Sequence, residues 1–343
     1  MAYHGVLDDV RTCGALGQPS RVPIFAITDE FDLRAAGVTH RAYSRDAEVM
    51  ARVQIGNARR FDYDWVFLIP DDFFEIEPLG VETVVGEHTP VAATRYLPAD
   101  RSTLQRLAMP DPRRDGRMPA MLHAVSAIKK ELGDTICLTG NVAAPFTSIA
   151  LLCGVADALL LPLDQPELLR EMTKFFIDWQ VAWGRAQIEA GADAIWLGDC
   201  VASSAFLSPA QFEEFALPGA REVCAALKDV GALVFYHAGE NRLSHLVLMA
   251  GVRPTALSVG ERNDLAQVKK ALGAKVCLMG NIDGIQVVER QGVEDVRRET
   301  RRILEAGKPG GAYIFNSGEG IPYGTPDENV AAMIQTGHRW AGY

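Results

Sequence analysis

Short apolar runs alternate along the chain with longer stretches in which apolar residues recur at helical spacing. This alternation is typical of repeated strand–helix units and a parallel sheet. The runs with strand character cover residues 22–28, 65–70, 135–138, 194–197, 233–236, 256–259, 275–279 and 312–315. Eight parallel strands close a barrel, so the pattern predicts an α/β fold, a (β/α)8 TIM barrel.

Two further patterns define the organisation of the chain. The segments 208–211 (Ser-Pro-Ala-Gln) and 325–328 (Thr-Pro-Asp-Glu) have the form of capping boxes with proline at the first helical position, which predicts helix starts. Residues 80–120 fit the repeat poorly, and we expect an insertion there, between strands 2 and 3, with a small hairpin and lid. No linker rich in Gly, Ser or Pro divides the chain, so residues 1–343 are predicted to form a single barrel domain.

Polar residues stand at the end of every predicted strand, where such barrels place their catalytic groups. They are Asp29, Glu30, Asp71, Asp72, Asn141, Asp199, His237, Glu261, Asn281, Asp283, Asn316 and Glu319. Any one of them could be a cap or a turn residue. A ring of carboxylates, amides and one imidazole from eight strands nevertheless predicts an enzyme active site.

Composition narrows the possible partners. The formal net charge of −10 argues against nucleic acid and anionic membranes as main partners. No apolar run is long enough for a transmembrane helix, and the first residues lack the pattern of a signal peptide. The six cysteines are scattered and form no CxxC pair, which indicates reduced thiols and a cytoplasmic protein. Arg262 is the one Lys or Arg directly at a strand end, which disfavours Schiff-base chemistry and phosphate binding.

Several motifs together resemble the uroporphyrinogen decarboxylase superfamily. They are GADAIWLGD at 191–199, the LSP..F..F..P pattern at 207–218, GN at 140–141 with PFT at 145–147, GNI at 280–282, and GIP at 320–322 followed by TPDEN at 325–329. The resemblance runs from about residue 22 through nearly the whole chain. It covers both the decarboxylases and the methylcobalamin:coenzyme M methyltransferases, and it implies a TIM barrel.

The resemblance favours the corrinoid methyltransferase branch. The decarboxylases carry an arginine-rich RQAGRY segment after the first strand, whereas this chain has Asp29 and Glu30 there, although Asp71 falls where they keep a central aspartate. Members that methylate a thiol bind zinc through a His-x-Cys pair and a later Cys. The corresponding positions here are His237, Gly239 and Glu319, so the histidine is kept and both cysteines are absent.

The resemblance and these departures lead to one hypothesis. The enzyme would move a methyl group from a methyl-corrinoid (methylcobalamin type), carried on a partner corrinoid protein, to tetrahydrofolate, as part of a demethylation system. Tetrahydrofolate attacks through a neutral amine and needs no metal to deprotonate it. The expected catalytic residues are His237, Glu319 and Asp199. The expected substrate-binding residues are Glu30, Asp71, Asn141, Asn281 and Asn316, and zinc on His237 and Glu319 is an open option.

Three alternatives stay open from the sequence. One is a uroporphyrinogen-decarboxylase-like decarboxylase, for which Arg95, Arg101 and Arg106 in the insertion would have to face the mouth. Another is a zinc-dependent methylcobalamin:thiol methyltransferase with an altered metal site. The third is a binding protein that kept the fold and lost the chemistry. The oligomeric state is also open, with a homodimer among the options.

Overall fold

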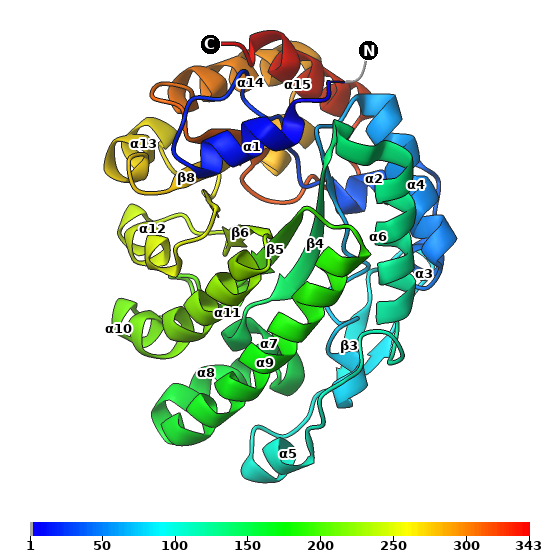
Figure 1. Cartoon of the computed structure of the whole chain (residues 1–343), viewed down its shortest axis with the longest axis vertical. Helices are drawn as coiled ribbons and strands as arrows, with labels where there is room; N and C mark the ends of the chain where they lie inside the picture. Colours follow the sequence, from blue (N-terminus) through cyan, green and yellow to red (C-terminus); the bar gives the residue numbers. More distant parts are fainter. Residues whose placement is uncertain (1–2) are drawn as a thin grey trace.

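A curled parallel sheet forms the centre of the molecule, as the computed structural model of residues 3–343 shows (Figure 1). Its seven strands follow the order β1 (Trp65–Phe67), β4 (Cys137–Ala143), β5 (Ala194–Gly198), β6 (Leu233–His237), β7 (Ala256–Ser258), β8 (Cys277–Ile282) and β9 (Tyr313–Ser317). Each strand pairs in parallel with the next. The TIM-barrel type of fold predicted from the hydrophobic pattern is therefore confirmed.

The first predicted strand, residues 22–28, differs from the prediction because it forms no regular ladder. On one side the Phe25 N–H donates to the Phe315 carbonyl of β9 (2.8 Å), and the Phe315 N–H donates to the Pro23 carbonyl (3.0 Å). On the other side the Ile24 N–H donates to the carboxylate of Asp64, just before β1 (2.9 Å). Proline has no N–H, and a side chain replaces a backbone acceptor, so the segment stays extended without becoming a strand.

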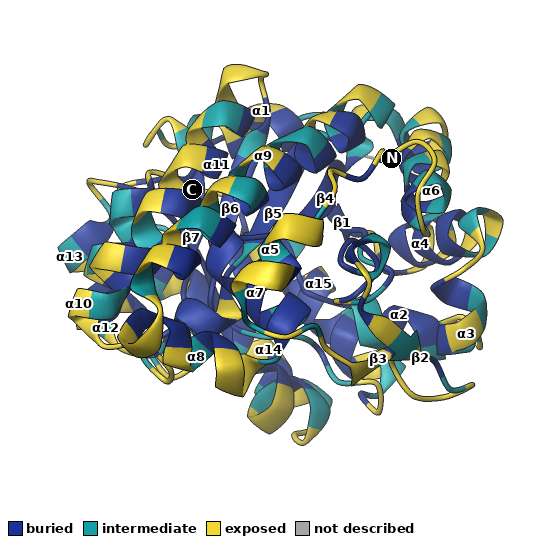
Figure 2. Cartoon of the chain, turned by 90° about the horizontal axis from the view of Figure 1, so that it is seen from below, coloured by how far each residue is buried: buried dark blue, intermediate teal, exposed yellow. Residues whose placement is uncertain are grey.

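Helices surround the sheet, with their outward faces exposed and their inward faces buried (Figure 2). They are α2 (Asp29–Ala35), α3 (His40–Tyr43), α4 (Ala47–Phe61), α6 (Met118–Leu132), α7 (Pro145–Cys153), α8 (Val155–Asp164), α9 (Pro166–Ala190), α10 (Pro209–Gln211), α11 (Leu217–Asp229), α12 (Leu243–Met249), α13 (Leu265–Leu272), α14 (Val293–Gly307) and α15 (Asp327–Trp340). Short turns of other helix types are η1 (Glu77–Leu79), η2 (Gly133–Thr135), η3 (Cys200–Ala202), η4 (Phe212–Ala216), η5 (Ala250–Val252) and η6 (Gly284–Glu289).

The barrel interior has a core of its own, built from alternate residues of the strands. Phe25, Trp65, Phe67, Trp196 and Phe235 are its aromatic members, and Phe25 stacks on Trp65 with ring centroids 4.9 Å apart. The helix α1 (Val6–Gly14) contributes its buried face to the same core at the end where the strands begin. One end of the barrel is thus filled by α1 and aromatic rings, so an open site can form only at the other end.

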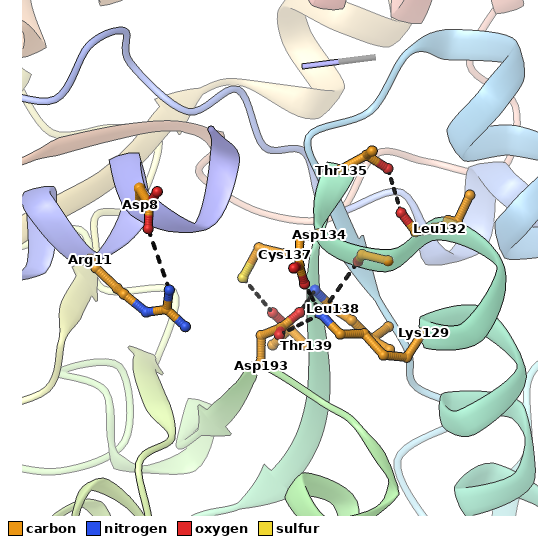
Figure 3. Close-up of polar contacts among 11 residues, drawn as sticks. Asp8, Arg11, Lys129, Leu132, Asp134, Thr135, Cys137, Leu138, Thr139 and Asp193 are labelled. Atoms are coloured by element: carbon orange, nitrogen blue, oxygen red, sulfur yellow. Dashed lines mark hydrogen bonds and ion pairs between the residues drawn. The ribbon is translucent and has the colours of Figure 1, made fainter. Parts of the chain in front are cut away.

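The motif around residue 193 helps to assemble this filled end. The Asp193 carboxylate accepts a hydrogen bond from the Leu138 N–H of β4 (2.9 Å) and pairs with the Lys129 ammonium of α6 (2.8 Å). Lys129 also contacts Asp134 of η2 (2.8 Å), and Figure 3 shows its ammonium between the two carboxylates. The aspartate of the GAD motif therefore joins α6 to two strands and serves the fold.

The insertion between the second and third predicted strands contains the expected hairpin. β2 (Glu82–Val84) pairs antiparallel with β3 (Ala92–Arg95), and the helix α5 (Arg101–Arg106) follows. The capping box at 208–211 is confirmed at the start of α10. The prediction of a capping box at 325–328 is wrong, because Pro326 is the N-cap of α15 and the buried Thr325 hydroxyl has no hydrogen-bond partner.

No single helix within residues 3–343 is long and apolar enough to cross a membrane, although α7 and α8 would pass such a test together, bent by 116°.

Candidate active site

A pocket of about 400 Å³ opens where the strands end. Its lining residues are Ile27, Asp29, Phe67, Ile69, Asp72, Asn141, Ala143, Thr147, Leu151, Trp196, Gly198, Cys200, Val201, His237, Glu319 and Gly320. Many of them continue the alternate positions that fill the interior core, since successive side chains of a strand point to opposite faces. The pocket is therefore the upper continuation of the barrel interior, and its volume is within the usual range for small-molecule sites.

His237 is the last residue of β6 and lies in the pocket wall with only 4% of its surface exposed. Its Nδ1 atom lies 2.9 Å from the Ser258 hydroxyl of β7, and its ring packs against Trp196 with the two ring centroids 4.7 Å apart. Burial alone would lower the pKa of this imidazole. Contacts with Cys200 and Glu319 outweigh burial and raise the pKa to about 10, so His237 carries a proton at neutral pH.

Glu319 faces His237 from the loop after β9, with 3.6 Å between Oε2 and Nε2. The loop is fixed on both sides, since the Gly318 N–H donates to the Ile282 carbonyl (2.9 Å) and the Ile321 N–H to the Ile27 carbonyl (2.7 Å). Burial raises the pKa of the Glu319 carboxyl, and the hydrogen bond and charge of His237 lower it. The effect of His237 is the larger one, so the pKa of Glu319 lies below its ordinary value. His237 and Glu319, both expected at the site, are thus brought together as an ion pair.

Gly239 makes this arrangement sterically possible. Its backbone is in the left-handed region (φ +58°), and a Cβ atom added there would lie 2.1 Å from Oε1 of Glu319. No carbon and oxygen atom can approach so closely without one moving away. The Glu319 carboxylate therefore occupies the space that a side chain at position 239 would need.

Two carboxylates form the opposite wall of the pocket. Burial, followed by the charges of Glu30 and Asp72, raises the pKa of Asp29 to about 7. The pKa of Asp72 is also raised, first by enclosure in the pocket and then by Asp71 and Glu30. A carboxyl group that titrates near neutrality inside a pocket is suited to general acid–base chemistry.

Glu30 and Asp71, the residues expected in this wall, line an adjoining hollow instead of the main pocket. Glu30 pairs with the His40 ring (2.8 Å). Asp71 is bound by both terminal nitrogens of Arg117, one of them at 3.0 Å. The expected substrate-binding roles of these two carboxylates have no direct support, because each already has a protein partner.

Asp199 is fully buried and does not line the pocket. Its carboxylate accepts hydrogen bonds from the Thr147 hydroxyl (2.9 Å) and the Tyr236 hydroxyl (2.7 Å). Burial raises its pKa to about 6 although both hydroxyls lower it. Asp199 directly follows Gly198, whose position faces the barrel interior, so its side chain takes the opposite face. The expected catalytic role does not fit this placement, which is that of an anchor for the turn after β5.

The three expected asparagines separate into two groups. Asn141 of β4 lines the pocket, and its backbone is held by Gln187 of α9. Asn281 is 2% exposed and donates to the carbonyls of Gly260 and Asn263 (both 3.0 Å). Asn316 is fully buried, and its side-chain oxygen accepts the Ser317 N–H (2.9 Å). Only Asn141 is therefore placed to contact a ligand in the pocket.

The comparisons with known proteins agree with the barrel and with the motifs. A family model described as uroporphyrinogen decarboxylase (URO-D) matches residues 15–340. The chain belongs to the uroporphyrinogen decarboxylase family. A uroporphyrinogen decarboxylase of Syntrophotalea carbinolica is 29% identical over 85% of this chain and 84% of its own. A methylcobamide:CoM methyltransferase, MtaA, of Methanosarcina barkeri is 26% identical over 93% of both chains.

A solved structure, a methyltransferase from Methanosarcina mazei, shares the fold with a TM-score of 0.89 over 98% of both chains, at 22% identity. The expected membership of the superfamily, with relatives in the methyltransferase branch, is thus confirmed. The family contains members named for two different reactions, and the residues of the pocket must distinguish between them.

The pocket has an acidic wall. The described residues that line the pocket and the adjoining hollow include no Lys or Arg. Two arginines of the insertion are engaged elsewhere, Arg95 with Glu82 and Arg101 with Glu171 (2.8 Å). Arg106, the third candidate, does not line the pocket either. Carboxylates of a substrate would therefore meet like charges in this pocket.

The residues present do not fit a zinc centre of the kind that activates thiols. Within residues 3–343, no group of three or more His, Cys, Asp or Glu side chains is arranged to hold a metal ion. His237 and Glu319 remain a pair of oppositely charged groups, and Gly239 has no side chain to add. Protein zinc sites use at least three protein ligands, so this pair alone does not form one.

Proposed function

We propose that this protein is a corrinoid-dependent methyltransferase that passes a methyl group to the N5 amine of tetrahydrofolate. The observation that carries the proposal is the acidic pocket without a cation other than His237, in a family that includes a methylcobamide:CoM methyltransferase. The methyl donor is a methyl-corrinoid presented by a partner corrinoid protein.

The charge of the pocket favours a neutral amine over an anionic acceptor. A thiolate or a substrate with several carboxylates would be repelled by Asp29 and Asp72 when these are ionised, while the charge of Glu319 is balanced by His237. An amine nitrogen that receives a methyl group as CH3⁺ becomes positively charged, and the same carboxylates stabilise that charge as it develops. The charge of the pocket thus suits the positively charged nitrogen that forms in amine methylation better than it suits a thiolate or a porphyrinogen.

The proton that the nitrogen must lose has a ready acceptor. The new C–N bond forms from the nitrogen lone pair, both electrons of the cobalt–carbon bond stay with the corrinoid, and the nitrogen then releases its own proton. Asp29, with a pKa of about 7, accepts this proton when it is ionised. Asn141 and Asp72 present oxygen acceptors to the N–H groups of the pterin ring.

His237 and Glu319 would act as a fixed pair beside the reacting atoms. The Ser258 hydroxyl and the Trp196 face hold the imidazole in one orientation, and the Glu319 carboxylate keeps it protonated. A fixed imidazolium can donate a hydrogen bond to an acceptor atom of the pterin and so aim N5 at the incoming methyl group. Holding two reactants in line is the main requirement of such a displacement.

The test is an anaerobic visible-spectrum assay with methylcobalamin and the purified protein. Parallel reactions contain tetrahydrofolate, coenzyme M or neither, and a further reaction without corrinoid contains uroporphyrinogen. We expect loss of the methyl–cobalt band with tetrahydrofolate only. Loss with coenzyme M only, or carbon dioxide release from uroporphyrinogen, would contradict the proposal and assign one of the other two reactions.

A further inference from the structure

The adjoining hollow is a small space beside the pocket, where the insertion meets the first helices. Its wall is formed by α2, α3, the loop after β1 and residues 90–91 ahead of β3. Figure 1 and Figure 2 both show α2, α3 and the hairpin of β2 and β3 side by side. The hollow has a volume of about 70 Å³ and shares Asp29, Ile69 and Asp72 with the pocket of about 400 Å³. It can therefore take one end of a ligand, but not its body.

Two buried polar groups in the wall of the hollow have no hydrogen-bond partner within residues 3–343. They are the Nδ1 atom of His40 and the hydroxyl of Ser44, and these residues are 7% and 1% exposed. Both residues line the hollow. A buried polar atom without a partner is destabilising, so two such atoms in one wall indicate a ligand that pairs with them.

The contacts of His40 decide which kind of ligand atom fits. Its Nε2 atom lies 2.8 Å from the Glu30 carboxylate, and its ring stacks on Tyr323 with the two ring centroids 5.8 Å apart. Because a carboxylate can only accept, Nε2 carries the hydrogen, and Nδ1 keeps its lone pair when the ring is neutral. The Ser44 oxygen can also accept a hydrogen bond. The unpaired atoms therefore suit a ligand group that donates hydrogen bonds.

The carboxylates around the hollow favour a donor with a positive charge. Arg117 balances the charge of Asp71. Asp29 and Asp72 face other carboxylates instead, which add to the effect of enclosure and raise the pKa of both groups. A cation beside these two side chains would stabilise their ionised forms.

Size, hydrogen bonding and charge lead to the same ligand group. We propose that the adjoining hollow is a binding subsite for a primary ammonium group, which belongs to a molecule whose body lies in the pocket. Such a group has three N–H donors, which suit the Ser44 hydroxyl, the His40 Nδ1 atom and a carboxylate of the shared wall. This inference concerns the hollow alone and is independent of the identity of the methyl acceptor.

The experiment titrates the whole protein, deuterated and labelled with nitrogen-15, with ethylammonium chloride. The backbone amide signals are followed by NMR, which gives both the place of binding and the dissociation constant. Three other compounds are titrated for comparison: ethanol has no charge, tetramethylammonium has the charge but no N–H, and acetate has the opposite charge. The ionic strength is kept constant with sodium chloride, so that general screening is equal in all titrations.

Two variants test the hydroxyl that carries the proposal. Ser44→Ala removes the unpaired hydroxyl of the hollow. Thr300→Val is the matched control, because the Thr300 hydroxyl of α14 is also buried and unpaired but lies outside the pocket and the hollow. Neither substitution removes a hydrogen bond within the described part of the chain, so neither should lower the midpoint of urea unfolding.

We expect ethylammonium to shift the amide signals of residues 40–44, with a dissociation constant in the millimolar range because the ligand has so few atoms. Ser44→Ala should weaken this binding about tenfold, the effect of one hydrogen bond to a charged group, and Thr300→Val should not change it. The three comparison compounds should bind at least about tenfold more weakly. The proposal is overturned if ethylammonium leaves these signals unshifted, if ethanol or tetramethylammonium binds equally well, or if Ser44→Ala binds ethylammonium as the wild type does.

Discussion

Replacing Gly239 with alanine tests whether Glu319 and His237 form one functional unit. The new Cβ would lie 2.1 Å from Oε1 and 3.3 Å from Cδ of Glu319, so the carboxylate must move by about 1 Å to reach ordinary contact. The left-handed backbone (φ +58°) adds a cost of about 1 kcal/mol for any residue with a Cβ. Because 46% of the Glu319 side chain is exposed, loss of its ion pair adds at most about 1 kcal/mol.

The stability loss should therefore be about 1–2 kcal/mol, while methyl transfer should fall at least tenfold because the carboxylate leaves His237. Gly37→Ala is the matched control, since Gly37 has a similar φ of +66° but open space around its Cβ position. The assays are urea unfolding and the rate with methylcobalamin and tetrahydrofolate. The reasoning is refuted if Gly239→Ala is as active as Gly37→Ala, or if Gly239→Ala still slows an enzyme that already carries Glu319→Ala.

Four further predictions concern single groups of the site. Because the Asp29 carboxyl stays protonated below its raised pKa, the rate of methyl transfer should rise as the pH passes about 7. Asp29→Asn should abolish this rise in a pH–rate profile. If the Asp29→Asn enzyme still shows the rise, Asp29 is not the base. His237→Gln should slow methyl transfer by about 100-fold or more with little change in unfolding midpoint, whereas His123→Gln, at an exposed position, should not. Asp199→Asn should destabilise the fold by about 1–3 kcal/mol, because the NH2 group of asparagine replaces one of the two oxygens that accept hydrogen bonds from Thr147 and Tyr236. An unchanged midpoint of urea unfolding would show that Asp199 does not anchor this turn. Treatment with a chelator should leave the rate unchanged, and metal analysis that finds one zinc ion per chain would contradict the ligand analysis.

The alternation of strands and helices predicted the barrel because each buried strand is apolar on both faces and is followed by an amphipathic helix. The prediction of a first strand at residues 22–28 was wrong in detail, because this segment is extended but forms no regular ladder. Pro23 cannot donate to a ladder, and the Asp64 carboxylate, 40 residues after Ile24 in the sequence, accepts the Ile24 N–H instead. No local pattern reveals that a side chain from elsewhere will replace a backbone acceptor.

The predicted site residues come from the end of the barrel where the pocket opens, but only some of them line that pocket. Counting alternate positions from the interior residues Phe25 and Ile27 leads to Asp29, and from Trp196 it leads to Gly198. The same count would have favoured Asp29 over Glu30 and turned Asp199 away from the pocket.

Other features depend on contacts between distant segments. Arg117 of the insertion neutralises Asp71, and Thr147 of α7 orients the turn that carries Cys200. Sequence spacing contains no information about either contact. The sequence could therefore indicate which residues reach the mouth, but not which of them already have a partner there.

The most direct test of the proposed reaction follows the methyl group itself. Methylcobalamin labelled with carbon-13 in its methyl group is incubated anaerobically with the protein and tetrahydrofolate, and the products are observed by NMR. Our account predicts that the label appears as an N5-methyl group of the folate, at a rate that Asp29→Asn and His237→Gln both reduce. If the label stays on the corrinoid in the presence of folate but moves to a thiol such as coenzyme M, the account of the acidic pocket is contradicted.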